Sequence, residues 1–200
     1  MGRPRKHDQE AILDAVARVI ARDGTLSLGA VAAEAGVAKA TVLYDHASKR
    51  DLLRALVQRT IAADNAFNAE CASGVAPGPD APLRGRIEAA RRVPVSEEGN
   101  PAVLGLIMAL MQEADLRADF RDSQAQILSG LMAEAANPAA TRLAWLALEG
   151  LKYQQHMALV SRSEAERLQI LDDIETLART GQVHPAAVAP GQSAQETSDE

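Results

Sequence analysis

The amino-acid sequence predicts an all-α protein, and three observations support this fold class. Apolar residues make up 47% of the 200 residues, which is enough to fill a core in one or two small domains. Aromatic residues reach only 2%, while Ala and Leu dominate and β-branched runs are scarce, so we expect a core of helix-forming aliphatic side chains. Apolar residues also recur at helical spacing between stretches that contain Gly or Pro.

Two short helices are predicted near the N-terminus. The first begins at Asp8, whose carboxylate can cap the free amides, and has an apolar face that includes Ile12. It ends at Gly24. The second follows Ser27, a favourable N-cap residue, and ends where Gly36 supplies the residue after the last helical turn.

A third and a fourth helix follow the turn at Gly36. The third covers residues 38–45, and its side chains are mostly too polar or small to form a core stripe, so Val42 and Leu43 are expected to hold it inward. Ser48 and Asp51 have the spacing of a capping box and begin the fourth, Leu-rich helix. Together the four helices form a compact head.

The remainder of the chain is predicted to be a helical body. Residues 72–82 contain three prolines and two glycines, which exclude a continuous helix. Residues 102–115 are apolar on nearly all sides and are expected in the core. The last two helices are joined only by Ser161 and Arg162, which favours an antiparallel hairpin. The helices predicted in the body span residues 83–92, 102–115, 116–136, 138–160 and 163–181.

These elements divide the chain into four parts. The tail is predicted to be disordered because its composition is polar and rich in Pro, Gly, Ser and Gln. The four parts are a basic arm at residues 1–7, a helix-turn-helix domain at 8–62 with its motif at 27–46, a helical body at 63–181 and the tail at 182–200.

The charge of the chain is unevenly distributed. The net charge of −6 alone disfavours a nucleic-acid partner, but residues 1–60 contain ten Lys or Arg and seven acids, a net of 10 − 7 = +3. The remaining 140 residues contain 11 basic and 20 acidic side chains, a net of −9. A basic head on an acidic body is the pattern expected for local phosphate binding. Ordinary fluctuation of composition is the alternative explanation.

Residues 27–46, SLGAVAAEAGVAKATVLYDH, have the spacing of two helices joined by a short Gly-containing turn, which is a helix-turn-helix. The AEAGV turn, the KAT start of the next helix, the aromatic Tyr44 and the SKRDLL sequence that follows resemble the DNA-binding head of TetR-family transcriptional regulators. The resemblance covers about the first third of the chain. Two positions depart from the usual pattern, since Ala38 replaces a capping Ser or Thr and Leu43 occupies the usual Tyr site.

The third helix is expected to read base edges in the major groove. Lys39 can donate to guanine O6 or N7, and the methyl groups of Ala40 or Thr41 can contact a thymine methyl. The resemblance implies a phosphate contact from Tyr44. Asp45 is repelled by phosphate, but it can accept a hydrogen bond from cytosine N4.

Other candidate contacts are expected to position the head on the DNA backbone. Ser27 and Lys49 lie at helix starts, where amide donors and the helix dipole favour a phosphate. The basic arm contains Arg3, Arg5 and Lys6 and is expected to enter the adjacent minor groove. A solvated, disordered terminus is the alternative for the arm.

For the body, the resemblance implies a homodimer that packs through the helices at about 138–160 and 163–180. A dimer sets two reading helices about 34 to 36 Å apart, so the DNA site is expected to be a palindrome. The alternative is that these apolar stripes are used entirely inside one protomer.

The resemblance also implies a pocket for a small-molecule effector of unknown identity. Plain core packing is the alternative reading of Met and aromatic residues at helical spacing, although Trp145 and Tyr153 each carry a polar tip that needs a partner when buried. The candidate lining residues are Met108, Met111, Phe120, Met132, Trp145, Tyr153 and His156.

Several function classes are disfavoured. Four His and one Cys lie scattered without metal-ligand spacing, and no phosphate-cradling Gly motif is present, so we expect no enzyme, metal or cofactor. The sequence has no membrane-spanning apolar run and no secretory signal, and Cys71 has no disulfide partner, which predicts a cytoplasmic protein.

The resemblance implies a repressor that a ligand releases from its operator. Activation is the alternative mode of regulation. A helical interaction module that has lost sequence-specific DNA binding is the competing function, motivated by Asp45 and by the uncapped helix start at Ala38.

Overall fold

The computed structural model describes residues 6–93 and 99–182. The regular structure of these residues is entirely α-helical, in agreement with the predicted fold class. Arg3, Arg5 and the predicted disordered tail from residue 183 onward lie outside the described residues. The helices are α1 (Lys6–Asp23), α2 (Leu28–Ala35), α3 (Lys39–Asp45), α4 (Lys49–Ser73), α5 (Ala81–Arg92), α6 (Pro101–Gln112), α7 (Ala114–Ala133), α8 (Pro138–His156) and α9 (Glu164–Thr180).

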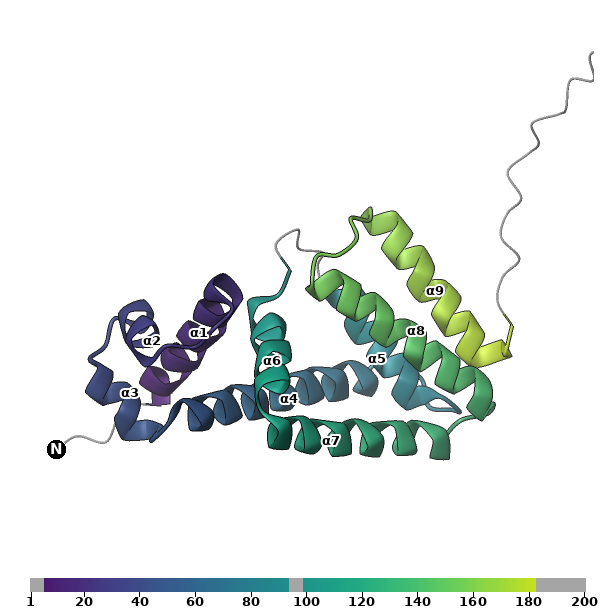
Figure 1. Cartoon of the computed structure of the whole chain (residues 1–200). Helices are drawn as coiled ribbons and strands as arrows, with labels where there is room; N and C mark the ends of the chain where they lie inside the picture. The colour runs from purple at the N-terminus through teal and green to yellow at the C-terminus, as the bar shows by residue number, and fades with distance from the viewer. Residues whose placement is uncertain (1–5, 94–98, 183–200) are drawn as a thin grey trace, which may run out of the picture.

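The head consists of α1, α2, α3 and the first half of α4 (Figure 1). Aliphatic side chains from all four helices meet in one core, because α1, α2 and α4 have apolar residues at the spacing predicted from the sequence and α3 contributes Val42. The stripe residues include Ile12, Val31, Val42, Leu52 and Leu53, all fully buried.

Helix α4 joins the head to the body without a linker. It runs unbroken for 25 residues, and Figure 1 shows it extending from the head along the base of the body. The boundary placed between residues 62 and 63 therefore falls inside a helix. Its first half contributes apolar side chains to the core of the head, and beyond residue 62 it continues to the buried Cys71 and packs on α5.

Helix α6 lies between the head and the body (Figure 1). Leu106 and Ala109 of α6 belong to the core of the head, and a Cβ atom on Gly105 would lie 3.2 Å from Leu56 and 3.4 Å from the Cα atom of Ala17. The glycine thus allows α6 to approach α1 and α4 closely. A helix that belongs to the body in sequence is part of the head in space.

The prediction of one helix over residues 102–115 is wrong at its end. Helix α6 stops at Gln112 because Glu113 is extended, with φ −121° and ψ 109°, and Asp115 belongs to the first turn of α7. The expectation that α6 is buried on nearly all sides is also wrong, since Met111 is exposed.

The core of the body is formed by α5, the end of α7, α8 and α9. Two buried polar residues join these helices. Asp80 accepts hydrogen bonds from the Thr141 hydroxyl at 2.5 Å and from the backbone N–H of Ala136 at 3.3 Å. Arg167 of α9 donates to the carbonyl oxygens of Ala90 at 2.7 Å and Arg91 at 3.1 Å, the last carbonyls of α5.

Most predicted helix caps are confirmed. The Ser48 hydroxyl accepts from the Asp51 N–H at 3.1 Å, Ser163 and Glu166 form a capping box, and Gly181 ends α9 in the left-handed conformation at φ 72°. Ser27 occupies the N-cap position of α2, but its side chain makes no capping hydrogen bond.

Other helix ends also differ from prediction. Helix α1 begins at Lys6, so this residue belongs to a helix rather than to the arm, and Asp8 is not the N-cap. Helix α5 begins at Ala81 rather than at residue 83, and α7 spans Ala114–Ala133 rather than 116–136. Helix α8 ends at His156, and residues 157–163 connect it to α9. The predicted extension to Val160 fails because Ala158 has a positive φ of 51°, which an α-helix does not accommodate.

Candidate nucleic-acid interface and ligand pocket

The turn between α2 and α3 has the predicted geometry. Gly36 adopts the left-handed conformation at φ 66°, and the N–H of Val37 donates to the carbonyl of Ala32 at 2.9 Å. These hydrogen bonds satisfy the carbonyls at the end of α2 and turn the chain directly into α3. The helix-turn-helix predicted at residues 27–46 is therefore formed.

Helix α3 presents most of its surface to solvent. Val42 is fully buried and anchors the helix, whereas the Tyr44 side chain is 76% exposed. Leu43 is also exposed, so the expectation that it holds the helix inward is wrong; Val42 alone fills the space above the core. Lys39 and Ala40 are exposed and Thr41 is half-buried at the start of the helix. These three lie where side chains of a reading helix reach base edges.

Most cations of the head are paired with carboxylates of the same chain. Arg18 and Arg22 both bind Glu34, at 2.8 and 2.9 Å. Hydrogen bonds from Arg18 and then Arg22 hold the pKa of Glu34 below its ordinary value, so this carboxylate stays charged. A helix surface neutralised in this way attracts phosphate weakly.

The same pairing occurs at the junction of α4 with α7. Arg50 binds Asp115, and Arg54 binds the same carboxylate at 3.1 Å. The hydrogen bond from Arg50 lowers the pKa of Asp115. Arg59 binds Glu10 at 3.2 Å and Asp14 at 2.8 Å, joining α4 to α1.

Within the described part of the head, Lys39 and Lys49 differ from these arginines because neither has a carboxylate within 4.0 Å. Both are exposed, at the start of α3 and of α4. Ser27 is exposed at the start of α2. In the described part of the head, Lys39 and Lys49 are thus unpaired cations at the starts of α3 and α4.

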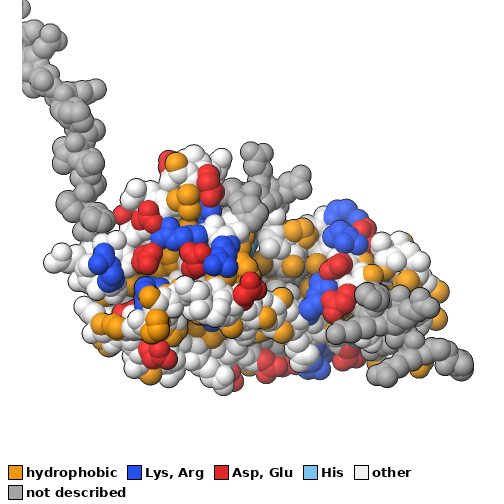
Figure 2. Space-filling model, turned by 180° about the vertical axis from the view of Figure 1, so that it is seen from behind, with side chains coloured by type: hydrophobic (Ala, Val, Ile, Leu, Met, Phe, Trp, Pro, Cys, Tyr) orange, Lys and Arg blue, Asp and Glu red, His pale blue; other side chains and the backbone are white. Residues whose placement is uncertain are grey.

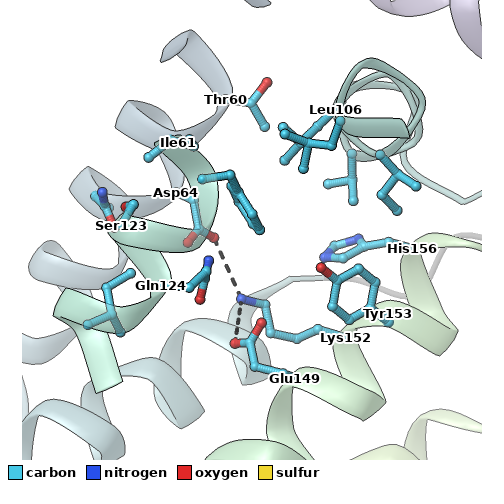
Figure 3. A pocket seen from close by; sticks show the side chains of 16 residues that line it. Thr60, Ile61, Asp64, Leu106, Ser123, Gln124, Glu149, Lys152, Tyr153 and His156 are labelled. Atoms are coloured by element: carbon cyan, nitrogen blue, oxygen red, sulfur yellow. Dashed lines mark hydrogen bonds and ion pairs between the residues drawn. The ribbon is translucent and has the colours of Figure 1, made fainter. Parts of the chain in front are cut away.

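A pocket lies in the body between α4, α6, α7 and α8 (Figure 3). Its volume is about 90 Å³. Lys152 lies between two carboxylates, 3.4 Å from Glu149 and 3.8 Å from Asp64. Apolar side chains, including Ile61 and Leu106, form the opposite wall. The pocket therefore combines an apolar wall with one cation held by two anions.

Phe120, Tyr153 and His156 are the predicted ligand-binding residues that line this pocket. The structure does not bring the other four into it. Met108 packs on the core of the head, Met132 and Trp145 pack on the core of the body, and Met111 faces solvent. The methionines of α6 do not line the pocket because of the helical period. The face of α6 that lines the pocket carries Val103, Leu106, Ile107 and Leu110.

Sequence reasoning missed the charged residues of the pocket. Glu149, the adjacent Lys152 and Tyr153, and His156 lie three or four residues apart in turn and form one polar stripe on α8. That spacing is visible in the sequence. Asp64 is not detectable in this way, because it reaches the pocket from a different helix.

Burial changes two pKa values in the pocket. The pKa of His156 lies below its ordinary value of 6.5, first because burial disfavours the imidazolium and second because Lys152 is near. The pKa of Tyr153 is raised by burial. Both side chains are therefore neutral at pH 7, and the pocket has only the charges of Asp64, Glu149 and Lys152.

Within the described residues, no group of three or more His, Cys, Asp or Glu side chains is arranged to hold a metal ion. None of the helices in residues 6–93 and 99–182 has the length and apolar character needed to cross a membrane.

Comparisons with known proteins identify both parts of the chain. Residues 12–56 match the family model described as "Bacterial regulatory proteins, tetR family", and residues 80–179 match the model described as "Tetracyclin repressor-like, C-terminal domain". Among curated proteins, none matches this chain.

Several solved structures have a similar fold. A TetR-like regulator from Rhodococcus is 19% identical, with a TM-score of 0.69, 90% of this chain covered and 98% of the other. LfrR from Mycobacterium smegmatis, in complex with proflavine, is 28% identical, with a TM-score of 0.57 and coverage of 90% and 99%. The Streptomyces coelicolor regulator SCO4454 is 20% identical, with a TM-score of 0.58 and coverage of 88% and 96%. With both family models matched in order along one all-helical chain, this protein belongs to the TetR family of DNA-binding, non-enzymatic transcriptional regulators.

Proposed function

We propose that this protein is a homodimeric repressor that binds a palindromic operator and is released by a small molecule. The observation that carries the proposal is the pair of unpaired lysines, Lys39 and Lys49, on the exposed tip of a head whose described arginines in α1 and α4 are ion-paired. Unpaired cations attract phosphate and base acceptors more strongly than cations that a carboxylate already neutralises.

Within this proposal, the start of α3 reads sequence. Lys39 donates to guanine, and Ala40 and Thr41 contact thymine methyl groups. Tyr44 is exposed enough to reach a phosphate, and Asp45 ends the same helix, where it accepts from cytosine N4.

The remaining contacts set position on the backbone. Ser27 and Lys49 face phosphates at the starts of α2 and α4. We assign Arg3 and Arg5 to the adjacent minor groove, with Lys6 at the start of α1.

The dimer is proposed to form mainly through α8. Leu143 and Leu146 are 56% and 52% exposed, and with Gly150 and Tyr153 they repeat at the three- and four-residue spacing of a helix–helix seam. Exposed apolar side chains that follow one face of a helix form a patch, and contiguous apolar patches mark interaction sites. The exposed residues of α9 are largely polar, so α9 is proposed to flank the seam.

The pocket is proposed to hold the effector, and the relative bound to proflavine indicates the kind of molecule. Proflavine is a planar aromatic cation, and a site with two carboxylates against one ammonium, next to Phe120, favours such a ligand. The volume of about 90 Å³ is far below the roughly 300 Å³ at which drug-sized ligand sites begin, so binding requires the pocket to open.

Opening of the pocket provides the link to DNA. The N–H of Asn100 donates to the carbonyl of His156 at 3.0 Å, so the end of α8 is tied to the start of α6. Helix α6 packs on α1 at Gly105. A ligand that separates α6 from α8 therefore favours a different position of the head and releases the operator by population shift.

Selection of bound sequences from random duplex DNA, followed by a salt titration, tests the DNA-binding part of the proposal. A palindromic motif with a steep salt dependence is the expected result. Weak, sequence-independent binding would overturn it and favour a helical interaction module. Proflavine added to the complex of the protein with the selected DNA is expected to release the DNA from the protein.

Sedimentation of a Leu143→Lys, Leu146→Lys variant tests the dimer. We expect a monomer, whereas Leu159→Lys is the matched control because Leu159 is an exposed leucine outside the α8 seam. A dimer that survives the double substitution contradicts the proposed interface.

A further inference from the structure

A second cavity adjoins the pocket of Figure 3. Its volume is about 490 Å³, and it is lined by α4, α5, α6 and α8, with Glu10 of α1 on its lining. The two share residues of three helices, namely Thr60 and Asp64 of α4, Val103 of α6, and Lys152 and His156 of α8, and only the second cavity reaches α5. Unlike the pocket, this cavity is within the usual size range of ligand sites.

Arg86 is the least satisfied charge in this cavity. Its side chain is only 14% exposed, and its nearest carboxylate oxygen, on Asp64, is 4.0 Å away. Among the described residues its guanidinium donates no hydrogen bond, although it has five N–H donors. A largely buried guanidinium whose nearest carboxylate oxygen is 4.0 Å away can take an anion as a closer partner.

Asp64 does not neutralise Arg86, because it is shared. Its carboxylate accepts from the Asn68 amide at 2.9 Å and also lies 3.8 Å from Lys152. Arg59 and Lys152 also line the cavity, but each has two carboxylate partners, Glu10 and Asp14 for Arg59 and Glu149 and Asp64 for Lys152. Arg86 is therefore the cavity cation with the weakest carboxylate partner.

The rest of the cavity wall is largely apolar. Phe67 of α4 and Ala63 one turn before it line the cavity together with Ala89 of α5, Val93 directly after α5, and Val103 of α6. A ligand that satisfies both features has an anionic end and an apolar body. Guanidinium groups bind carboxylates through two parallel hydrogen bonds, which a single ammonium does not provide.

We propose that this cavity binds an organic carboxylate with an apolar body, whose carboxylate pairs with Arg86. Binding at this site does not depend on the proposed repressor function. An effect of this ligand on DNA binding does depend on the proposed repressor function. Such an effect is expected because Arg59 and Glu10, which form the ion pair between α4 and α1, lie in the wall of the same cavity.

Calorimetric titration of the full chain, without DNA, tests the proposal. The probes are 3-phenylpropionate, octanoate and benzoate, and the neutral comparison is 3-phenylpropionamide. We expect at least one carboxylate to bind, and 3-phenylpropionamide to bind roughly tenfold or more weakly than its acid, because the charge-assisted pair is absent.

Variants locate the binding charge. Arg86→Gln is expected to weaken carboxylate binding by roughly tenfold or more, and Arg86→Lys to give an intermediate value. Arg92→Gln, on the same helix but paired with Glu88 outside the cavity, is the matched control and retains binding. Thermal unfolding of each variant checks that it is folded.

Three results overturn the proposal. They are no heat of binding with any of the three carboxylates up to about 10 mM, equal affinity for the acid and its amide, and unchanged affinity in folded Arg86→Gln. The comparison of acid with amide needs no variant, so it decides the matter even if Arg86→Gln fails to fold. Because DNA is absent, failure here is distinct from failure of operator binding.

Discussion

Replacing Arg167 with Met is expected to destabilise the body strongly. Arg167 is 2% exposed, and its guanidinium donates to the carbonyls of Ala90 and Arg91 at 2.7 and 3.1 Å. These carbonyls lie in the last turn of α5, where no intrahelical donor is available. Met retains most of the apolar stem but leaves both oxygens buried without a donor.

The magnitude follows from these two contacts. Hydrogen bonds to a charged donor are each worth about 1.5 to 3 kcal/mol, which gives about 3 to 6 kcal/mol for the pair. Removal of a buried charge recovers part of this, so we expect a net loss of about 3 kcal/mol. The accompanying ion pair with Glu164 adds little, because that carboxylate is 56% exposed.

Urea unfolding followed by circular dichroism at one fixed protein concentration measures the change. Arg179→Met is the control, since Arg179 is an exposed arginine on the same helix with no ion pair among the described residues, and a change within about 0.5 kcal/mol is expected for it. A loss below about 1 kcal/mol for Arg167→Met refutes the view that this side chain caps α5.

Three further predictions concern the head, the pocket and the packing of α4 on α5. Lys39→Ala should relax base preference at one position per half-site, at a cost of about 1 to 3 kcal/mol in binding free energy, whereas Lys49→Ala should weaken binding to all sequences alike and reduce the salt slope by about 1. Identical behaviour of the two variants in a binding selection contradicts these roles. Burial lowers the pKa of His156 in the folded protein, so the unfolded chain takes up this proton first as the pH falls below 6.5, and the stability of the fold declines. His156→Asn should flatten that decline in urea titrations between pH 7.5 and 5, and an unaltered slope argues against this effect of His156. Gly85→Ala should lower the unfolding midpoint, since the new Cβ would lie 2.7 Å from the backbone Cα of Ala72 and overpacking costs about 1 to 3 kcal/mol. A raised midpoint would mean that α5 shifts freely away from α4.

Several helix ends were predictable because they carry local signals in the sequence. Ser48 with Asp51 at the start of α4 and Ser163 with Glu166 at the start of α9 form their caps within four residues of sequence, and Gly36 ends α2 as predicted. Such signals act locally, so no knowledge of the remaining chain is needed.

The charged part of the pocket was not predictable in the same way. Asp64 and Lys152 are 88 positions apart, and only the packing of α4 against α8 places their charged atoms 3.8 Å from each other. The boundary between head and body was also missed, because α4 has no glycine or proline at residue 62 and the helix continues. Periodicity identifies a helix but does not tell which neighbouring helices that helix packs against.

The length of α4 has a mechanical consequence. At 1.5 Å per residue its 25 residues make a rod of about 37 Å, with the reading helix attached at one end and both cavities along the other half. A rigid rod magnifies rotation, so each degree of tilt at the far end displaces the reading end by about 0.6 Å. A tilt of only five degrees thus moves each reading helix by about 3 Å, nearly one base-pair step along the duplex.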